Sequence, residues 1–298
     1  MAFGTTNLQG SPQALGATFY NKTIDNSLRM GDAQNSTLQW SAGTPSSTSI
    51  WTMSFWIKFW DPEAGQAATE FFSAGTGGSA YSFFALNASE QFIHQTELPG
   101  ARNKGWDRII RDPSSWYHFV LRADLNQTAT ADKLKWYVNG VLETDTFTDG
   151  ISQSTWSFIN ASGVTQNWGG KTGIANGNPG ADVYLAEINF CDGQSYGPEK
   201  FGEDKNGVWI PREPNVTYGN NGYRLEFKQT GTGTGSASTV GADTSGRNNH
   251  FDSSGIASQD VLPDSPTNNF ATMNSVAYTN GINLTKGNLI VATTTNNR

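Results

Sequence analysis

The sequence of 298 residues has one cysteine, few charged side chains and no long apolar run. A single cysteine, Cys191, excludes an intramolecular disulfide, and its apolar surroundings indicate a small buried thiol rather than a reactive one. Charged residues make up only 15% of the chain, below the ~25% that is typical of soluble domains. No apolar segment approaches the ~20 residues of a membrane-spanning helix, so we expect no membrane insertion.

The sequence also lacks basic clusters. Lys and Arg total 19 against 26 Asp and Glu, which gives a formal net charge of −7. Binding of DNA or RNA requires clustered positive charge that neutralises phosphates, so the composition excludes a nucleic-acid partner. Residues 1–7 have neither the basic nor the apolar region of a signal peptide. We therefore expect a protein that is made in a cytoplasm and is not exported by the usual route.

Aromatic residues and glycine are abundant. The chain has 10 Trp, 17 Phe and 33 Gly, and this aromatic content is too high for a disordered chain. Glycine with frequent Ser, Thr and Asn is typical of many short strands joined by turns. Helical periodicity is nearly absent: the best short helix is at 198–202, and 63–72 is a weaker candidate.

Segment 50–60 gives the clearest strand signal. Its alternating apolar residues are Trp51, Met53, Phe55, Ile57 and Phe59. Trp56 and Trp60 interrupt the alternation and place rings on the second face. This pattern predicts a strand with one face in the core and a second face that is also covered.

Hairpin signals follow further along the chain. Segments 116–122 and 133–138 are strand-like, with a polar hairpin loop at 123–132 between them. Asn139-Gly140 predicts a tight type I′ turn into 141–143, because both central positions of that turn need positive φ. Further strands are expected at 183–190, 222–228 and 288–292.

Two glycine-rich stretches, 160–182 and 230–238, are interpreted as loops. Many short strands, long polar loops and little helix predict an all-β fold, an antiparallel two-sheet jelly-roll sandwich. We expect an N-terminal arm at 1–22, the sandwich at 23–210, and a C-terminal β extension at 211–298. That extension packs on the sandwich or on a neighbouring subunit.

Several motifs together resemble the laminin-G-like, concanavalin-A-like lectin jelly roll. They are the Thr-x-Ser-Phe-Trp strand in 51–58, the Trp-x-His strand in 116–120, the Tyr-Val-Asn-Gly hairpin in 136–140 and the strand at 185–193. A later series is similar to virion structural proteins of tailed phages, notably marine ones. It comprises 196–202, 206–211, 222–227, 243–251 and 264–270, in this order.

A jelly roll of this family can host glycoside hydrolases, so catalysis was considered. Retaining hydrolysis needs two carboxyl groups ~5.5 Å apart. The Glu-x-Asp-x-x-Glu spacing that supplies them in the family is missing here, and Glu187 stands alone in its strand. The three histidines are far apart in sequence, and no Gly-x-Ser-x-Gly elbow is present. His118 lies between aromatics and is interpreted as a packed, hydrogen-bonded side chain, so we expect no enzymatic activity.

Sugar binding would use exposed aromatic faces beside polar side chains. Trp168, with Asn167 and two glycines around it, and Trp106 in Lys-Gly-Trp-Asp are the candidates for a glycan site. The alternative is that each ring lies under its own loop or at a subunit contact, where Trp is enriched.

The resemblance also implies a calcium site at the rim of the sandwich. Asp243, Asn248 and Asn249 match the family's Asp-x-Ser-Gly-Asn loop, although Arg247 stands where relatives often have Asn. Ca²⁺ takes 6 to 8 oxygen ligands, which Asp and Asn can supply. The alternative is an Asx turn in which the side chain bonds its own backbone.

These observations lead to one functional hypothesis. The chain is expected to be a non-enzymatic virion structural protein that assembles in a host cytoplasm, forms a homo-oligomer and contacts other capsid or tail proteins. Three roles stay open. It is a tail or head fibre that binds host surface glycan, a decoration protein that stabilises the capsid, or a secreted carbohydrate-binding module, which the missing signal peptide disfavours.

Overall fold

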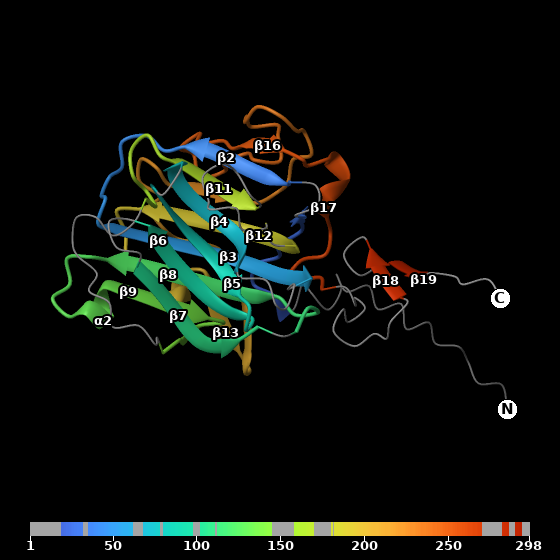
Figure 1. Cartoon of the computed structure of the whole chain (residues 1–298), viewed down its shortest axis with the longest axis horizontal. Helices are drawn as coiled ribbons and strands as arrows, with labels where there is room; N and C mark the ends of the chain where they lie inside the picture. Colours follow the sequence, from blue (N-terminus) through green and yellow to red (C-terminus); the bar gives the residue numbers. More distant parts are fainter. Residues whose placement is uncertain are drawn as a thin grey trace.

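The computed structural model describes residues 19–31, 35–61, 68–77, 80–97, 102–110, 112–144, 158–169, 180 and 182–269, with the backbone of two later strands. This part of the chain forms two large antiparallel sheets that pack face to face, which confirms the expected jelly-roll sandwich (Figure 1). None of its helices is long and apolar enough to cross a membrane.

The first sheet has eight strands and is called the eight-stranded sheet. In order across the sheet they are β10 (Val141–Leu142), β9 (Leu134–Val138), β8 (Tyr117–Asp124), β3 (Ile50–Asp61), β12 (Asp182–Asp192), β1 (Ser27–Met30) and β17 (Val261–Leu262), with β15 (Tyr223–Leu225) as a further partner of β12. The long strands β3 and β12 form its centre.

The second sheet has seven strands and is called the seven-stranded sheet. Its order is β16 (Asp252–Ser254), β2 (Thr37–Ser41), β11 (Thr165–Gly169), β4 (Ala68–Gly77), β5 (Ala80–Asn87), β6 (Gln91–Glu97) and β7 (Arg102–Ile109). The remaining elements are the hairpins β13 (Gly202–Lys205) with β14 (Val208–Pro211) and β18 (Ile282–Thr285) with β19 (Ile290–Thr293), and the short helices α2 (Thr130–Lys133), η2 (Pro198–Lys200) and η3 (Ser258–Asp260).

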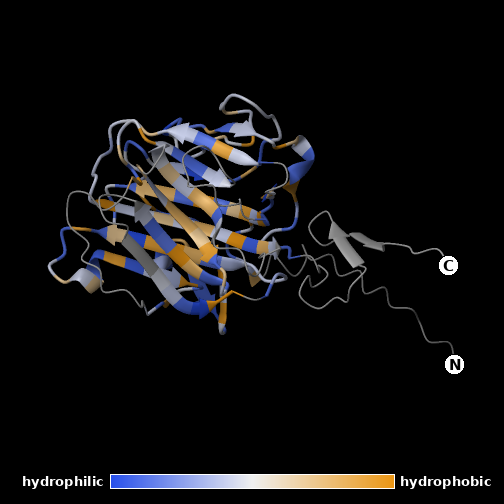
Figure 2. Ribbon diagram, in the orientation of Figure 1, coloured by the Kyte–Doolittle hydropathy of each residue, from blue (hydrophilic) through white to orange (hydrophobic). Residues whose placement is uncertain are grey.

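Aromatic rings from both sheets fill the space between them. Phe55 of β3 has its ring centroid 5.8 Å from that of Phe71 on β4 and 5.1 Å from that of Trp168 on β11. Figure 2 shows the hydrophobic residues concentrated along the strands, whereas the connecting loops are hydrophilic. The alternating residues predicted from segment 50–60 are buried in this core, as expected from the two-residue repeat of a strand.

The outer face of the eight-stranded sheet is covered too, as the second ring face of segment 50–60 predicted. Trp56, Trp116 and Tyr184 form a separate buried cluster there with Ile24. Lys58 on the same face is fully buried; its Nζ lies 3.0 Å from Asp264 Oδ2 and 2.9 Å from Asn269 Oδ1. The C-terminal segment is thereby fastened across the central strand.

The Asn139–Gly140 turn has the predicted conformation, with φ of +48° and +78°. Glycine is required at the second position for a further reason. A Cβ on Gly140 would lie 2.3 Å from the ring of Trp209, and a Cβ on Gly202 would lie 2.5 Å from it. The indole of Trp209 therefore lies against two glycines, which allows hairpin β13–β14 to approach the outer face closely.

The segment after residue 210 contributes strands to the sandwich. Strands β15 and β17 pair with β12 and β1, and β16 pairs with β2, so the segment after residue 210 supplies strands to both sheets. This segment packs on the sandwich, one of the two arrangements expected for it. Residues 1–18 of the expected arm lie outside the described residues.

Two local expectations are corrected and one is confirmed. Residues 68–72, part of the weak helix candidate, belong to strand β4 and pair with strand β5. Within the expected loop 160–182, residues 165–169 form strand β11. The short helix expected at 198–202 is present as η2.

Candidate ligand-binding site

At one edge of the sandwich, here called the open edge, β7 of one sheet faces β9 and β10 of the other, and a hollow lies between their described residues. The rings of Trp106 on β7 and Trp136 on β9 meet there with centroids 5.0 Å apart. The tight turn before β10 returns the chain along β9, so that the backbone N–H of Glu143 donates to the Trp136 carbonyl at 2.9 Å. This local hairpin places the Glu143 side chain beside the two indoles.

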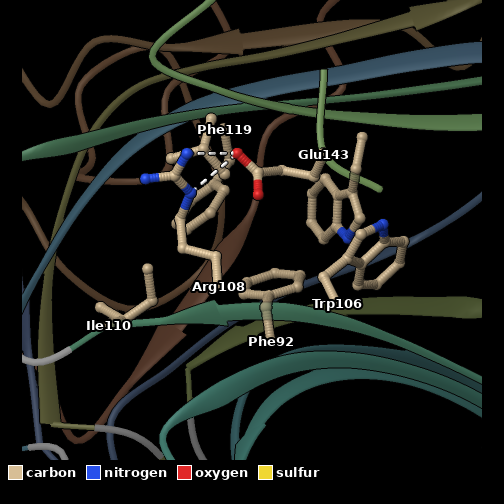
Figure 3. A pocket seen from close by; sticks show the side chains of 8 residues that line it. Phe92, Trp106, Arg108, Ile110, Phe119 and Glu143 are labelled. Carbon is tan, nitrogen blue, oxygen red and sulfur yellow. Dashed lines mark hydrogen bonds and ion pairs between the residues drawn. The ribbon is translucent and has the colours of Figure 1, made fainter. Parts of the chain in front are cut away.

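An ion pair joins the two sheets at this edge. Arg108 Nε and Nη2 each lie 2.7 Å from the same oxygen, Oε1 of Glu143 (Figure 3). The Arg108 side chain is 42% exposed, whereas that of Glu143 is 11% exposed. Figure 3 shows the second oxygen of Glu143 directed away from the guanidinium, toward the rings below. No donor among the described residues contacts this second oxygen.

Two cavities adjoin the ion pair. The larger one, the edge hollow, has a volume of about 270 Å³ and opens to the surface. Its described lining residues are Trp106, Ala131, Leu134, Lys135, Trp136, Leu142, Glu143 and Thr144. The smaller one, the inner cavity, has about 10 Å³ and lies among Phe92, Trp106, Arg108, Ile110, Phe119, Trp136, Val138 and Glu143 (Figure 3). Trp106, Trp136 and Glu143 border both.

The three candidate glycan-binding residues, Trp106, Asn167 and Trp168, are buried in the structure. Trp168 is fully buried; its Nε1 donates to the Tyr223 hydroxyl at 3.1 Å, and it cannot offer a ring face to a sugar. Asn167 is also fully buried, on the same strand. Trp106 is 3% exposed, so it is no platform either, but it forms a wall of the edge hollow. Both rings are therefore buried, which is the alternative that the sequence left open for them.

The proposed calcium residues form a different structure. Asp243 Oδ1 accepts from the backbone N–H groups of Arg224 and Ser245, both at 2.8 Å. Its Oδ2 accepts from the Ser245 hydroxyl and the Asn249 N–H, both at 2.9 Å. Asn248 is exposed, with φ of +61°. Donors surround the carboxylate as in an Asx turn, and this set does not fit Ca²⁺, which needs oxygen ligands.

No group of three or more His, Cys, Asp and Glu side chains within the described part of the chain could hold a metal ion. Asp192 shows how such a carboxylate is used instead. Its two oxygens accept four hydrogen bonds, from Ser46, Ser47, Asn160 and Asn221. Burial opposes ionisation, but these hydrogen bonds lower the pKa of Asp192. Asp192 therefore fastens three loops at one end of the sandwich.

A buried Ser–His pair lies under hairpin β13–β14. The Trp209 indole donates to His118 Nδ1 at 2.9 Å, and His118 Nε2 lies 2.9 Å from Ser54 Oγ. An indole N–H can only donate, so the neutral imidazole carries its proton on Nε2 and donates to Ser54. Burial lowers the pKa of His118 to about 3. A ring in this tautomer cannot take the Ser54 proton, which agrees with the packed histidine predicted from the sequence.

A network of ion pairs surrounds Glu187, the glutamate that stands alone in its strand in the sequence. Arg224 Nη2 lies 2.6 Å from Glu187 Oε1 and 3.3 Å from Glu226 Oε1, and Lys22 Nζ lies 2.9 Å from Glu213 Oε2. Burial raises the pKa of Glu187, whereas hydrogen bonds from Arg224 and Lys22 outweigh burial and lower that of Glu213 to about 2.

Carboxyl pairs with pKa values shifted apart occur in acid–base catalysis. Here the guanidinium of Arg224 occupies the space between Glu187 and Glu226, and the edge hollow and inner cavity lie elsewhere. We interpret the network as a fastening of the N-terminal segment, through Lys22, to the eight-stranded sheet.

The ion pair at the open edge had no signal in the sequence. Arg108 and Glu143 are 35 residues apart; Arg108 lies on β7 of one sheet and Glu143 directly follows β10 of the other, so only the packing of the sheets brings them together. An apolar Val-Leu pair followed by Glu at an edge strand is a common sequence, and it does not distinguish a ligand site from a solvated edge.

The two antiparallel sheets packed face to face define the class of protein, an all-β jelly-roll sandwich. No protein-family profile matches the sequence, and no curated protein matches it. Three solved structures are similar to this chain at 12–14% identity.

A native heptameric SAP-like pentraxin from Limulus polyphemus has a TM-score of 0.44 and 14% identity over 65% of this chain and 88% of that chain. Domains LG4-5 of the mouse laminin alpha1 chain have a TM-score of 0.41 and 12% identity, over 72% of this chain and 51% of that chain. The CBM40 of a Ruminococcus gnavus IT-sialidase, bound to alpha2,3 sialyllactose, has a TM-score of 0.35 and 13% identity, over 56% and 91%. Similarity at this level says nothing about the ligand of this chain.

Proposed function

We propose that this chain is a non-enzymatic, lectin-like binding protein of a tailed-phage particle, and that it holds a host surface glycan in the edge hollow. The observation that carries the binding role is the edge hollow itself: about 270 Å³ with two indoles, a carboxylate, Lys135 and Thr144 in its wall. Small-molecule sites combine an apolar lining with a few polar groups and start near ~300 Å³. The edge hollow therefore suits one ring of a saccharide.

The polar and apolar groups of the edge hollow complement a sugar. A pyranose has an apolar face made of C–H groups, which suits the exposed side chain of Leu142, and hydroxyls, which can bond the Glu143 carboxylate and Thr144. Leu142 is 50% exposed and Val141 is 59% exposed, so apolar surface continues from the edge hollow onto the strand β10. Exposed apolar residues beside a hollow are typical of a binding surface.

The chemistry of the candidate nucleophiles favours binding over catalysis. Ser54 faces a histidine in the wrong tautomer, and the guanidinium of Arg224 separates two of the glutamates. The Cys191 thiol is buried, and burial raises its pKa, which disfavours the reactive thiolate.

The virion placement rests on the motif series at 196–202, 206–211, 222–227, 243–251 and 264–270. Contacts between distant parts of the chain fit an anchored domain: Ser265 and Thr267 hydroxyls both donate to the Ile24 carbonyl, at 2.5 and 2.9 Å. The N-terminal and C-terminal segments thus run side by side at the covered face, where other capsid or tail proteins and further copies of the chain would be joined. In Figure 1, α2 and β9, which border the edge hollow, lie on the left, whereas β17 of the C-terminal segment lies on the right.

The binding role is tested on an array of bacterial surface polysaccharides and oligosaccharides. The variant Leu142→Arg places a long charged side chain at the edge hollow, and we expect at least a tenfold loss of binding. Val208→Arg is the matched control, because Val208 is also 50% exposed and lines neither cavity. Equal binding by wild type and Leu142→Arg would overturn the site, and no bound glycan at all would overturn the glycan role.

The particle placement is tested separately by labelling the protein in micrographs of purified particles. Label on the tail or on head fibres supports the appendage. Label spread over the capsid, with loss of head stability when the protein is removed, supports the decoration protein. Absence of the protein from purified particles contradicts both and leaves the free carbohydrate-binding module.

A further inference from the structure

The cations at the open edge already have carboxylate partners. Among the described residues that line the two cavities, Arg108 and Lys135 are the basic ones. Arg108 directs two nitrogens at Glu143, and Lys135 Nζ lies 2.8 Å from Asp132 Oδ1. The hydrogen bond from Lys135 lowers the pKa of Asp132, so this pair is ionised at neutral pH. An incoming acidic group would therefore meet cations whose charge a carboxylate already balances.

Only one of the two carboxylate oxygens of Glu143 has a partner among the described residues. Both contacts from Arg108 go to Glu143 Oε1, and the second oxygen is turned toward the rings of the cavities (Figure 3). A carboxylate oxygen can only accept hydrogen bonds at neutral pH, and a hydroxyl donor forms a short, charge-assisted bond to it. A sugar hydroxyl suits this oxygen, whereas a second carboxylate is repelled by it.

A buried hydrogen-bond donor beside Glu143 also favours a ligand with hydroxyl groups. The indole N–H of Trp136, which borders both cavities, is buried without a partner in the described part of the chain. A buried donor of this kind is stabilised by any acceptor that reaches it. A hydroxyl group offers both a donor for Glu143 and an acceptor for an indole, so a neutral saccharide can use both, whereas a carboxylate supplies acceptors alone.

We infer that the edge hollow selects neutral, hydroxyl-bearing glycans and rejects sialylated or uronic-acid glycans, and that the Arg108–Glu143 pair sets this preference. The inference rests on the proposed glycan role. The formal net charge of −7 acts in the same direction, because it repels anionic polysaccharides at a distance. Arg108, half-exposed and bound through one oxygen only, would become an anion-binding group if Glu143 lost its charge.

The test uses immobilised oligosaccharides in matched pairs that differ by a single sialic acid or uronic acid. Wild-type protein should bind the neutral member of at least one pair, and its acidic partner at least tenfold more weakly. Equal or tighter binding of the acidic members overturns this inference and leaves the glycan role intact. Absence of binding to every member overturns the glycan role itself.

The variant Glu143→Gln keeps the shape of the side chain, removes the negative charge and releases Arg108. We expect the preference to move at least tenfold toward the acidic members, while the control Glu199→Gln, an exposed glutamate outside both cavities, keeps the wild-type preference. A folded Glu143→Gln protein with the wild-type preference contradicts the inference. If its melting curve shows that it does not fold, Arg108→Gln replaces it. Removal of this cation should deepen the rejection of acidic members, and a gain in their binding contradicts the inference.

Discussion

The covered face of the eight-stranded sheet and the open edge each contain an ion pair between distant segments, but the two pairs use their carboxylates differently. At the covered face, Lys58 is fully buried, and the two oxygens of Asp264 accept from Lys58 and from the Trp116 indole. At the open edge, Arg108 is 42% exposed and uses one oxygen of Glu143. The covered pair uses both carboxylate oxygens within the fold, whereas the edge pair leaves one carboxylate oxygen without a partner among the described residues.

The largest effect is expected from breaking the covered pair. Lys58→Met leaves Asp264 buried without its cation, and removal of one partner of a buried pair costs about 3–5 kcal/mol. Urea unfolding of the variant measures this loss. The double variant Lys58→Met/Asp264→Leu removes both charges and should recover most of the stability. A loss under about 1 kcal/mol in the single variant would mean that the pair is not committed to the fold.

A smaller effect is expected where hairpin β13–β14 covers the sheet. In Gly140→Ala the new Cβ meets the Trp209 ring, whereas in the control Gly163→Ala nothing lies within 4 Å. Both glycines have positive φ, +78° and +73°, so both variants carry the backbone cost of about 1–2 kcal/mol. Crowding against the Trp209 ring should lower the free energy of unfolding by about 1–3 kcal/mol more in Gly140→Ala alone. Equal unfolding free energies for the two variants would contradict the close contact of Trp209.

A pH-dependent effect is expected from His118 under the same hairpin. Its pKa in the folded state, about 3, is below the ordinary value of 6.5, so the unfolded chain binds a proton that the folded chain does not. Stability is therefore unaffected above pH 6.5 and falls as the pH decreases from 6.5 toward 3. At pH 5 the loss is about 2 kcal/mol.

Urea unfolding at pH 7, 6 and 5 measures this loss, with His118→Gln as the control because its side chain does not titrate. Wild type and variant should differ in their pH dependence between pH 6.5 and 5, where the lowered pKa values of Asp192 and Glu213 contribute little. Parallel curves would contradict a buried neutral His118.

The covered and open regions also differ in how far the sequence predicts them. The strands of the eight-stranded sheet have apolar side chains on both faces, and segments 50–60, 116–122 and 183–190 were identified from that pattern. The Asn139–Gly140 turn was predicted because its chemistry is local. The resemblance to a lectin-like jelly roll came from these same aromatic strands.

Much of the seven-stranded sheet was not predicted. Strand β7, Arg-Asn-Lys-Gly-Trp-Asp-Arg-Ile, and strand β11, Thr-Gln-Asn-Trp-Gly, have mostly polar residues around a single tryptophan, and this composition is equally typical of a loop. Their tertiary environment, not their propensity, makes them strands. The same misreading made Trp168 a surface candidate. The edge hollow depends on the packing of two sheets, and no local pattern contains that information.

The smallest effect is expected from removing calcium. Both carboxylate oxygens of Asp243 are used within the fold, as are those of Asp264 and unlike those of Glu143. Each Asp243 oxygen accepts two hydrogen bonds, so neither oxygen is left for a metal. Addition of EGTA should therefore leave the melting temperature unchanged. A decrease that CaCl₂ reverses and MgCl₂ does not would contradict this, and loss of that response in Asp243→Ala would assign it to this loop. An unchanged melting temperature would fit a carboxylate whose four hydrogen bonds serve the fold, in contrast to Glu143, where both contacts from Arg108 go to one oxygen.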